Sequence, residues 1–257
     1  MTRSADLVTS SDGHSVTKQE VRVADPDFAS PRMERVLDTA ADLLVRWGYQ
    51  RVTIDEVARH AGIGKGTVYL HFHNKEALFL TVLLRAQRQI VAAMADRMEA
   101  VPDEVLLSRL LRGLYLVLSN DAIARVLYMG DAEVLGRLAH EAADTLGALV
   151  GRRREVLTEH LRLLSAAGCL RSDLSPEALL YTFSAIGTGF FFVGGMPGGT
   201  PDLDVETRAD LLEHAIATAI QVPDPAPAAL AKVAPVIAAL YRSLITDIDH
   251  EVRRRIR

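Results

Sequence analysis

Apolar side chains recur at helical spacing along most of this chain. The clearest short series consists of Val36, Ala40, Leu43, Leu44 and Trp47. Residues repeated every three to four positions share one face of an α-helix, which can then pack against a core. Alanine and leucine are abundant while aromatic residues make up only 5 % of the chain, a balance that favours helices over sheets. We find no convincing strand pattern, so the sequence predicts an all-α fold.

Breakers and changes of composition divide the chain into four parts. Residues 1–29 are polar with little periodicity, which predicts a disordered leader. Ser30 and Pro31 then supply a cap and a first helical residue. The predicted parts are the leader 1–29, a head 30–85, a helical body 86–250 and a basic tail 251–257. Body helices are expected near 103–118, 121–136, 139–167, 176–194, 205–221 and 228–248.

The head contains two short predicted helices on either side of a glycine turn. Thr53 and Glu56 have the spacing of a capping box, which starts the first of these helices. Gly62 stands where the chain needs a tight turn, and the second helix is expected over Lys65 to His71. Apolar or small residues occupy the shared core, namely Val57, Ala58, Ile63 and Val68. This arrangement predicts a helix-turn-helix whose second helix enters the major groove of DNA.

The residues from Thr53 to Phe72, with the following Asn74-Lys-Glu-Ala-Leu78, closely resemble the DNA-binding domain of TetR-family regulators. The match extends from Arg32 to about Arg85. Beyond it the resemblance is architectural only. The family often has Ser or Thr where this chain has Gly64, so the cap of the second helix is weakened.

This resemblance implies a homodimeric transcriptional regulator, usually a repressor, that a small ligand releases from DNA. It also implies a three-helix head joined by a long helix to a C-terminal helical domain for ligand binding and dimerisation. A two-fold dimer presents two reading helices to successive major grooves, so we expect a pseudo-palindromic operator. The competing interpretation is a helical protein- or ligand-binding module whose helix-turn-helix no longer reads DNA.

The predicted contacts with DNA follow from the chemistry of the motif. Lys65 can neutralise a phosphate, Gly66 lets backbone approach the duplex, and Thr67 can reach a phosphate or a base edge. Leu70 can give only apolar contact to bases. Helix N-termini favour phosphate at two further positions. The predicted DNA-binding residues are Thr53, Lys65, Gly66, Thr67, Tyr69, Leu70, His71 and Lys75.

Two further sets of residues are expected in the body. A largely apolar pocket for a hydrophobic or amphipathic molecule is predicted from Leu114, Tyr115, Tyr128, Leu135, His160, Phe183 and Phe190. Small residues that allow close helix packing suggest a dimer interface, and they are Ser184, Ala185, Gly187 and Gly189.

Charge is distributed unevenly along the chain. Between Arg32 and Arg85, eight Arg or Lys exceed six Asp or Glu by two, whereas the whole chain carries −4. A mildly basic head on an acidic body suits a protein that contacts phosphates locally. The single cysteine, Cys169, is interpreted as a small apolar filler.

Other classes of protein find little support in the sequence. We find no phosphate loop, nucleophile elbow or metal motif, and His71 and His73 lack a third ligand nearby, so neither an enzyme nor a bound metal or cofactor is expected. No signal peptide is recognised, and the apolar runs appear too short or glycine-rich to cross a bilayer. A cytoplasmic location without membrane contact is therefore expected.

Overall fold

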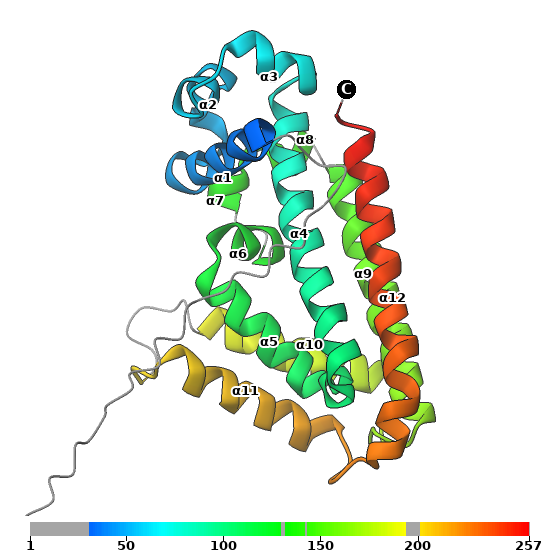
Figure 1. Ribbon diagram of the computed structural model, residues 1–257. Coiled ribbons are helices and arrows are strands. Elements are labelled where there is room, and N and C mark those ends of the chain that lie inside the picture. Colours follow the sequence, from blue (N-terminus) through cyan, green and yellow to red (C-terminus); the bar gives the residue numbers. More distant parts are fainter. Residues whose placement is uncertain (1–30, 130–131, 142, 194–200, 257) are drawn as a thin grey trace, which may run out of the picture.

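The computed structural model describes residues 31–129, 132–141, 143–193 and 201–256, and the predicted leader lies outside this range. The described residues form an all-α fold, which confirms the prediction (Figure 1). The head and its exit helix are α1 (Pro31–Arg51), α2 (Ile54–His60), α3 (Lys65–His71) and α4 (Lys75–Ala100). The body comprises η1 (Pro102–Val105), α5 (Leu107–Asn120), α6 (Ala122–Met129), α7 (Ala132–Leu135), α8 (Arg137–Glu141), α9 (Ala143–Ala166), α10 (Pro176–Val193), α11 (Val205–Ile220) and α12 (Pro227–Arg253).

Capping residues fix where several helices begin and end. Gly48, with φ of 73°, breaks the regular helix of α1, although a last turn continues to Arg51. Asn74 Oδ1 accepts a hydrogen bond from Ala77 N at 2.8 Å and starts α4. These side chains satisfy or interrupt the backbone hydrogen bonds that a helix end leaves open.

Helix α4 is the spine of the molecule. Its 26 residues span about 39 Å at the usual rise per residue. It runs from the head into the body without a break, and thus crosses the predicted domain boundary after residue 85. Helix α1 packs on its first part and α12 along much of its length (Figure 1). The side chains of Leu78, Phe79 and Leu83 on this spine are almost completely buried.

Charged clamps hold α12 on the spine. The guanidinium of Arg242 bonds both Asp96 and Glu99 of α4. Nearer the head, Arg88 Nε donates to Asp249 Oδ1 at 2.6 Å, and both side chains are less than one-fifth exposed. Helix α12 continues through Pro235. The clamps therefore tie one uninterrupted helix to α4 at two heights.

A buried histidine joins three elements inside the body. His160 of α9 is fully buried, with its Nε2 2.7 Å from the carbonyl oxygen of Val105 and its Nδ1 3.1 Å from Tyr241 Oη of α12. Because a carbonyl only accepts, Nε2 carries the proton and Nδ1 accepts from the tyrosine hydroxyl. Burial lowers the pKa of this imidazole to about 4. His160 is thus a neutral, hydrogen-bonded core residue.

Three helices, α4, α10 and α12, are long and apolar enough to cross a membrane by length and composition alone. The sequence analysis judged the apolar runs too short, so this finding corrects it. In α4, 67 % of the apolar window is buried inside the protein. Packing against α1 and α12 accounts for that hydropathy.

Candidate DNA interface

The first helix of the motif begins at a complete capping box. Thr53 Oγ1 accepts a hydrogen bond from Glu56 N at 3.2 Å, and Glu56 Oε2 accepts one from Thr53 N at 2.8 Å. These hydrogen bonds lower the pKa of the Glu56 carboxyl below its ordinary value. The predicted box is therefore present, and it orients α2 at the outer end of the head.

The turn between the two short helices depends on Gly62. Its φ of 68° lies in the left-handed region, which glycine adopts without steric cost. Ile63 N then donates to the carbonyl of Ala58 at 3.0 Å and closes the turn. Val57 and Val68 are fully buried between the helices. The shared core predicted for this motif is confirmed at these positions.

Helix α3 presents the predicted reading residues on the outside of the head. Leu70 is 68 % exposed and Tyr69 is 39 % exposed, which is unusual for large apolar side chains. Lys65 and Gly66 are also exposed, whereas Thr67 and His71 are half-buried. The helix begins at Gly64, which offers no side-chain cap, as the sequence predicts. An uncovered apolar face beside a cation is the arrangement that a base-reading helix needs.

The Lys65 ammonium already has partners in the unbound head. Its Nζ lies 2.7 Å from Asp55 Oδ1 and 5.7 Å from the centroid of the Tyr69 ring. The hydrogen bond that the ammonium donates to Asp55 raises the pKa of the lysine. Both partners of this ion pair are more than half exposed, so solvent weakens it. A phosphate can therefore replace Asp55 as the partner of Lys65 at little cost.

The start of α4 places a second cation near the head surface. Lys75 Nζ lies 4.2 Å from the centroid of the Tyr49 ring and 3.5 Å from the carbonyl oxygen of Gln50. Thr53, the other predicted helix-start residue, is exposed. The structure thus brings Thr53 and Lys75 to the same head as α3.

The sequence analysis did not predict one neighbour of the reading helix α3. The backbone of Ile256 pairs with that of Phe72, the residue directly after α3, in an isolated antiparallel bridge. The preceding Arg254 and Arg255 both bond Glu251. The sequence analysis interpreted this run as a basic tail, since nothing local reveals a contact with a residue so far away in sequence. The end of α12 therefore touches the end of α3 (Figure 1).

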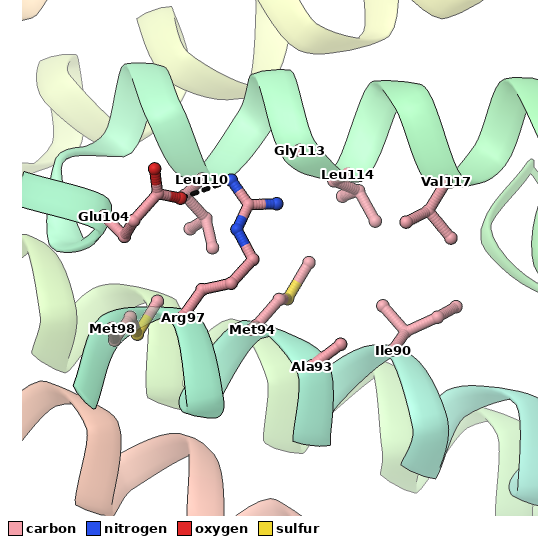
Figure 2. A pocket seen from close by; sticks show the side chains of 10 residues that line it. All are labelled: Ile90, Ala93, Met94, Arg97, Met98, Glu104, Leu110, Gly113, Leu114 and Val117. Carbon is pink, nitrogen blue, oxygen red and sulfur yellow. Dashed lines mark hydrogen bonds and ion pairs between the residues drawn. The ribbon is translucent and has the colours of Figure 1, made fainter. Parts of the chain in front are cut away.

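The seven predicted pocket residues do not form one cavity. Leu114 lines a cavity of about 30 Å³ between α4 and α5, where Ile90 and Met94 face Leu114 and Val117 (Figure 2). In the same cavity the Arg97 side chain passes beneath Gly113 toward Glu104, with which it forms an ion pair. This cavity is mostly apolar, and the ion pair of Arg97 and Glu104 lies in its wall.

The other predicted pocket residues lie in several places. Tyr115 lines a separate hollow whose wall comes from α5, α6, α10 and α11. Tyr128 joins Leu114 in packing against a small buried cluster around Ile90, and the guanidinium of Arg153 lies 4.5 Å above its ring. Leu135 belongs to α7, which packs on α1. Three further residues belong to α9 and α10, namely the buried His160 and Phe183 and the half-buried Phe190.

The four predicted interface residues of α10 divide between two faces. Ser184, Ala185 and Gly189 are exposed. Gly187 is buried against α5, because a Cβ there would lie 3.0 Å from a methyl group of Leu111. The exposed face also carries Tyr181, which is 75 % exposed. Gly187 therefore packs α10 inside the subunit, whereas the other three face outward.

Two smaller expectations concern Cys169 and metals. Cys169 is buried, and burial raises the pKa of its thiol, as suits an apolar filler. Within the described ranges, no three His, Cys, Asp or Glu side chains gather as a metal site would require.

Comparison with known proteins matches the head to a described family. The family model for bacterial regulatory proteins of the tetR family covers residues 36–82. The uncharacterized HTH-type transcriptional regulator YhgD of Bacillus subtilis is 41 % identical over 61 residues, which are 23 % of this chain and 32 % of YhgD. The chain spans about a third or less of the length of the first curated relatives it matches.

Longer similarities reach into the body. The HTH-type transcriptional repressor BepR of Brucella suis is 25 % identical over 174 residues, covering 63 % of this chain and 79 % of BepR. The solved structure of the fatty acid degradation regulator FadR from Bacillus halodurans aligns with a TM-score of 0.54 at 19 % identity, covering 73 % of this chain and 95 % of that one. At this identity the structural likeness concerns the fold alone.

Proposed function

Because the chain belongs to the tetR family of bacterial regulatory proteins, which are DNA-binding transcriptional regulators, we propose that it is a homodimeric repressor controlled by a small molecule. The observation that carries the proposal is the exposed face of α3, with Leu70 uncovered beside Lys65. Residues 30–85 act as the DNA-binding part and residues 86–250 as the part that dimerises and binds the effector. A protein that acts on DNA in this way belongs in the cytoplasm.

In the proposed complex, α3 lies in the major groove. Leu70 contacts base edges, and Thr67 contacts a base or a phosphate. Lys65 exchanges Asp55 for a phosphate, and Tyr69 and His71 bond the neighbouring backbone. Thr53 and Lys75, at the starts of α2 and α4, contact further phosphates. Gly66 lies where the backbone of α3 approaches the duplex most closely.

The proposed dimer uses the outward face of α10. Tyr181, Ala185 and Gly189 recur at helical spacing on that face and are exposed. Small residues allow a partner helix to approach closely, and the tyrosine supplies apolar area. A two-fold axis beside α10 presents two α3 helices to a pseudo-palindromic operator with half-sites about 34 Å apart.

The proposed switch works through α4. The helix begins beside α3, and its middle part lines the cavity at Leu114. An effector that binds better when α4 is displaced favours heads that are wrongly spaced for the operator. The apolar and aromatic residues predicted for the effector pocket support a hydrophobic or amphipathic effector. The word repressor in the name of BepR supports repression as the output.

The direct test measures binding to duplexes selected from a random pool. We expect Lys65→Ala to weaken binding about tenfold on every sequence and to reduce the salt slope by about one. The matched control is Arg171→Ala, which breaks a comparable exposed ion pair with Asp173 in the body. Equal binding by the Lys65→Ala protein and the wild type would instead favour a helical binding module whose helix-turn-helix no longer reads DNA.

A second test concerns the dimer. Ala185→Arg places a charge on the exposed face of α10, and we expect sedimentation to show monomers at micromolar concentration. Val150→Arg is the control, since Val150 is 55 % exposed on α9, outside the proposed interface. A dimer that persists in the Ala185→Arg protein would refute the interface.

A further inference from the structure

A hollow of about 330 Å³ is lined by residues of α5, α6, α10 and α11. Its wall includes polar and aromatic side chains from all four helices. Those that matter here are Tyr115, Ser119, Arg125, Phe191 and Arg208. The volume is at the lower end of the range for small-molecule sites.

Two guanidinium groups in this wall have no acidic partner among the described residues. They are Arg125 of α6 and Arg208 of α11. The acids one helical turn before them are engaged elsewhere: Asp121 Oδ1 accepts from Ala124 N, and Asp204 Oδ1 accepts from Thr207 N. Both arginines line the hollow.

Arg208 provides the stronger sign of a missing partner. Its Nε is buried and makes no hydrogen bond. Buried donors are nearly always satisfied, so an orphaned guanidinium nitrogen in a cavity wall points to an acceptor that binds there. By contrast, Arg112, on the neighbouring part of α5, bonds Asp210 and Glu206 of the same α11. An acidic partner is thus available along α11 for one arginine but not for the other.

The other part of the wall is aromatic. The rings of Tyr115 and Phe191 stack with centroids 5.1 Å apart and planes 29° apart. The hydroxyls of Tyr115 and Ser119 also make no side-chain hydrogen bond to another described residue. The hollow therefore combines two cations, two hydroxyls and an apolar ring surface.

We propose that this hollow binds an organic acid, with its anionic group between Arg125 and Arg208 and its apolar part on the rings of Tyr115 and Phe191. The assignment rests on the proposed function, in which the body receives an effector, and it names the chemical class of that effector. Charge-assisted hydrogen bonds from guanidinium to carboxylate are among the strongest in proteins. An amphipathic acid satisfies both halves of this wall at once.

The position of the hollow also connects it to the spine. Leu118 lines the hollow and packs in the same small buried cluster as Ile90 of α4. Phe191 packs against that cluster as well. A ligand that moves Leu118 or Phe191 therefore presses on α4, whose first turn adjoins the reading helix.

Calorimetry with probes of one size and different charge tests the site. Phenylacetate, phenethyl alcohol and phenethylamine share a ring and differ in charge, and acetate lacks the ring. We expect phenylacetate to bind at least about tenfold more tightly than each of the other three. Equal binding of the three ring compounds, or no binding of phenylacetate at about 1 mM, would overturn the proposal.

Variants of the full-length protein assign the contacts. Arg208→Gln and Arg125→Gln are each expected to weaken phenylacetate binding about tenfold, whereas Arg208→Lys keeps part of it. Arg125 is exposed, so its replacement leaves folding intact, which thermal melting verifies. Arg162→Gln, which removes an exposed and paired arginine on α9, is the matched control. Binding unchanged in both Gln variants would refute the site.

Release of DNA is measured separately. Loss of DNA binding on adding phenylacetate, absent in Arg208→Gln, supports both the acid site and the switch. If phenylacetate binds through the arginines while the affinity for DNA stays constant, the acid site stands and the proposed switch fails.

Discussion

Mild acid should destabilise this protein through its buried histidine, His160, before the hydrogen-bonded carboxyls such as Glu56 take up protons. Its ring is fully buried, and both of its nitrogens are occupied by Val105 and Tyr241. Burial lowers its pKa from the ordinary 6.5 to about 4. The unfolded chain therefore takes up a proton below pH 6.5, whereas the folded protein resists it until about pH 4.

The size of the effect follows from this interval. One pKa unit corresponds to about 1.4 kcal/mol. The free energy of unfolding therefore falls by about 3 kcal/mol as the pH drops from above 6.5 to below about 4. The loss begins as the pH drops through the unfolded value and is complete below the folded one. Above neutrality His160 makes no such contribution, because it is neutral in both states. A loss of this size is a large fraction of the stability of an ordinary domain.

Urea unfolding at several pH values between about 7 and 5 measures the loss, with His160→Gln as the reference. The variant is expected to be less stable at neutral pH, because it loses packing and a hydrogen bond. Its deficit should shrink by up to about 1.4 kcal/mol per pH unit on acidification, since only the wild type carries the titrating ring. A constant deficit, or an NMR titration of His160 near its ordinary pKa, would refute the reasoning.

Three further predictions concern the head. Thr53→Ala should lower the free energy of unfolding by about 1 kcal/mol by removing the cap of α2, while Thr53→Ser should retain it; chemical denaturation decides, and equal losses would contradict the role of the hydroxyl. Gly64→Ser should stabilise α3 by a few tenths of a kcal/mol, whereas Gly64→Ala should destabilise it; the same sign for both in thermal melts would refute the missing cap. Asp55→Asn should tighten DNA binding about threefold by freeing Lys65, and an unchanged Kd would show that the ion pair does not compete with phosphate.

Much of the fold is predictable because the signals that define it are local. The break at Gly48, the turn at Gly62 and the caps at Thr53 and Asn74 each depend on residues within one turn of helix. Apolar spacing likewise places the body helices near their expected positions. Local patterns therefore recover the elements and most of their ends.

The sequence does not show which distant parts of the chain contact one another. The partners of His160 come from residues 55 and 81 positions away. Nothing local shows that Ile256 returns to Phe72, or that Arg112 finds acids on α11 while Arg208 does not. These features arise only when the helices pack.

The predicted sites show the same division. The DNA residues all lie on or beside one short motif, so the structure brings them together on the head. The pocket residues were chosen by type across several helices, and packing sends Leu114 and Tyr115 to different cavities. Similarly, helical spacing alone does not tell which face of α10 turns inward, and Gly187 differs from Ala185 for that reason.

Selection of bound duplexes from a random DNA pool tests the central claim most directly, with Tyr69→Phe and Lys65→Ala proteins compared with the wild type. The proposed function predicts an enriched inverted repeat with half-sites about one helical turn apart, bound more weakly by both variants. No enriched sequence at low salt, or enrichment that both variants leave unchanged, would contradict a sequence-reading role for α3.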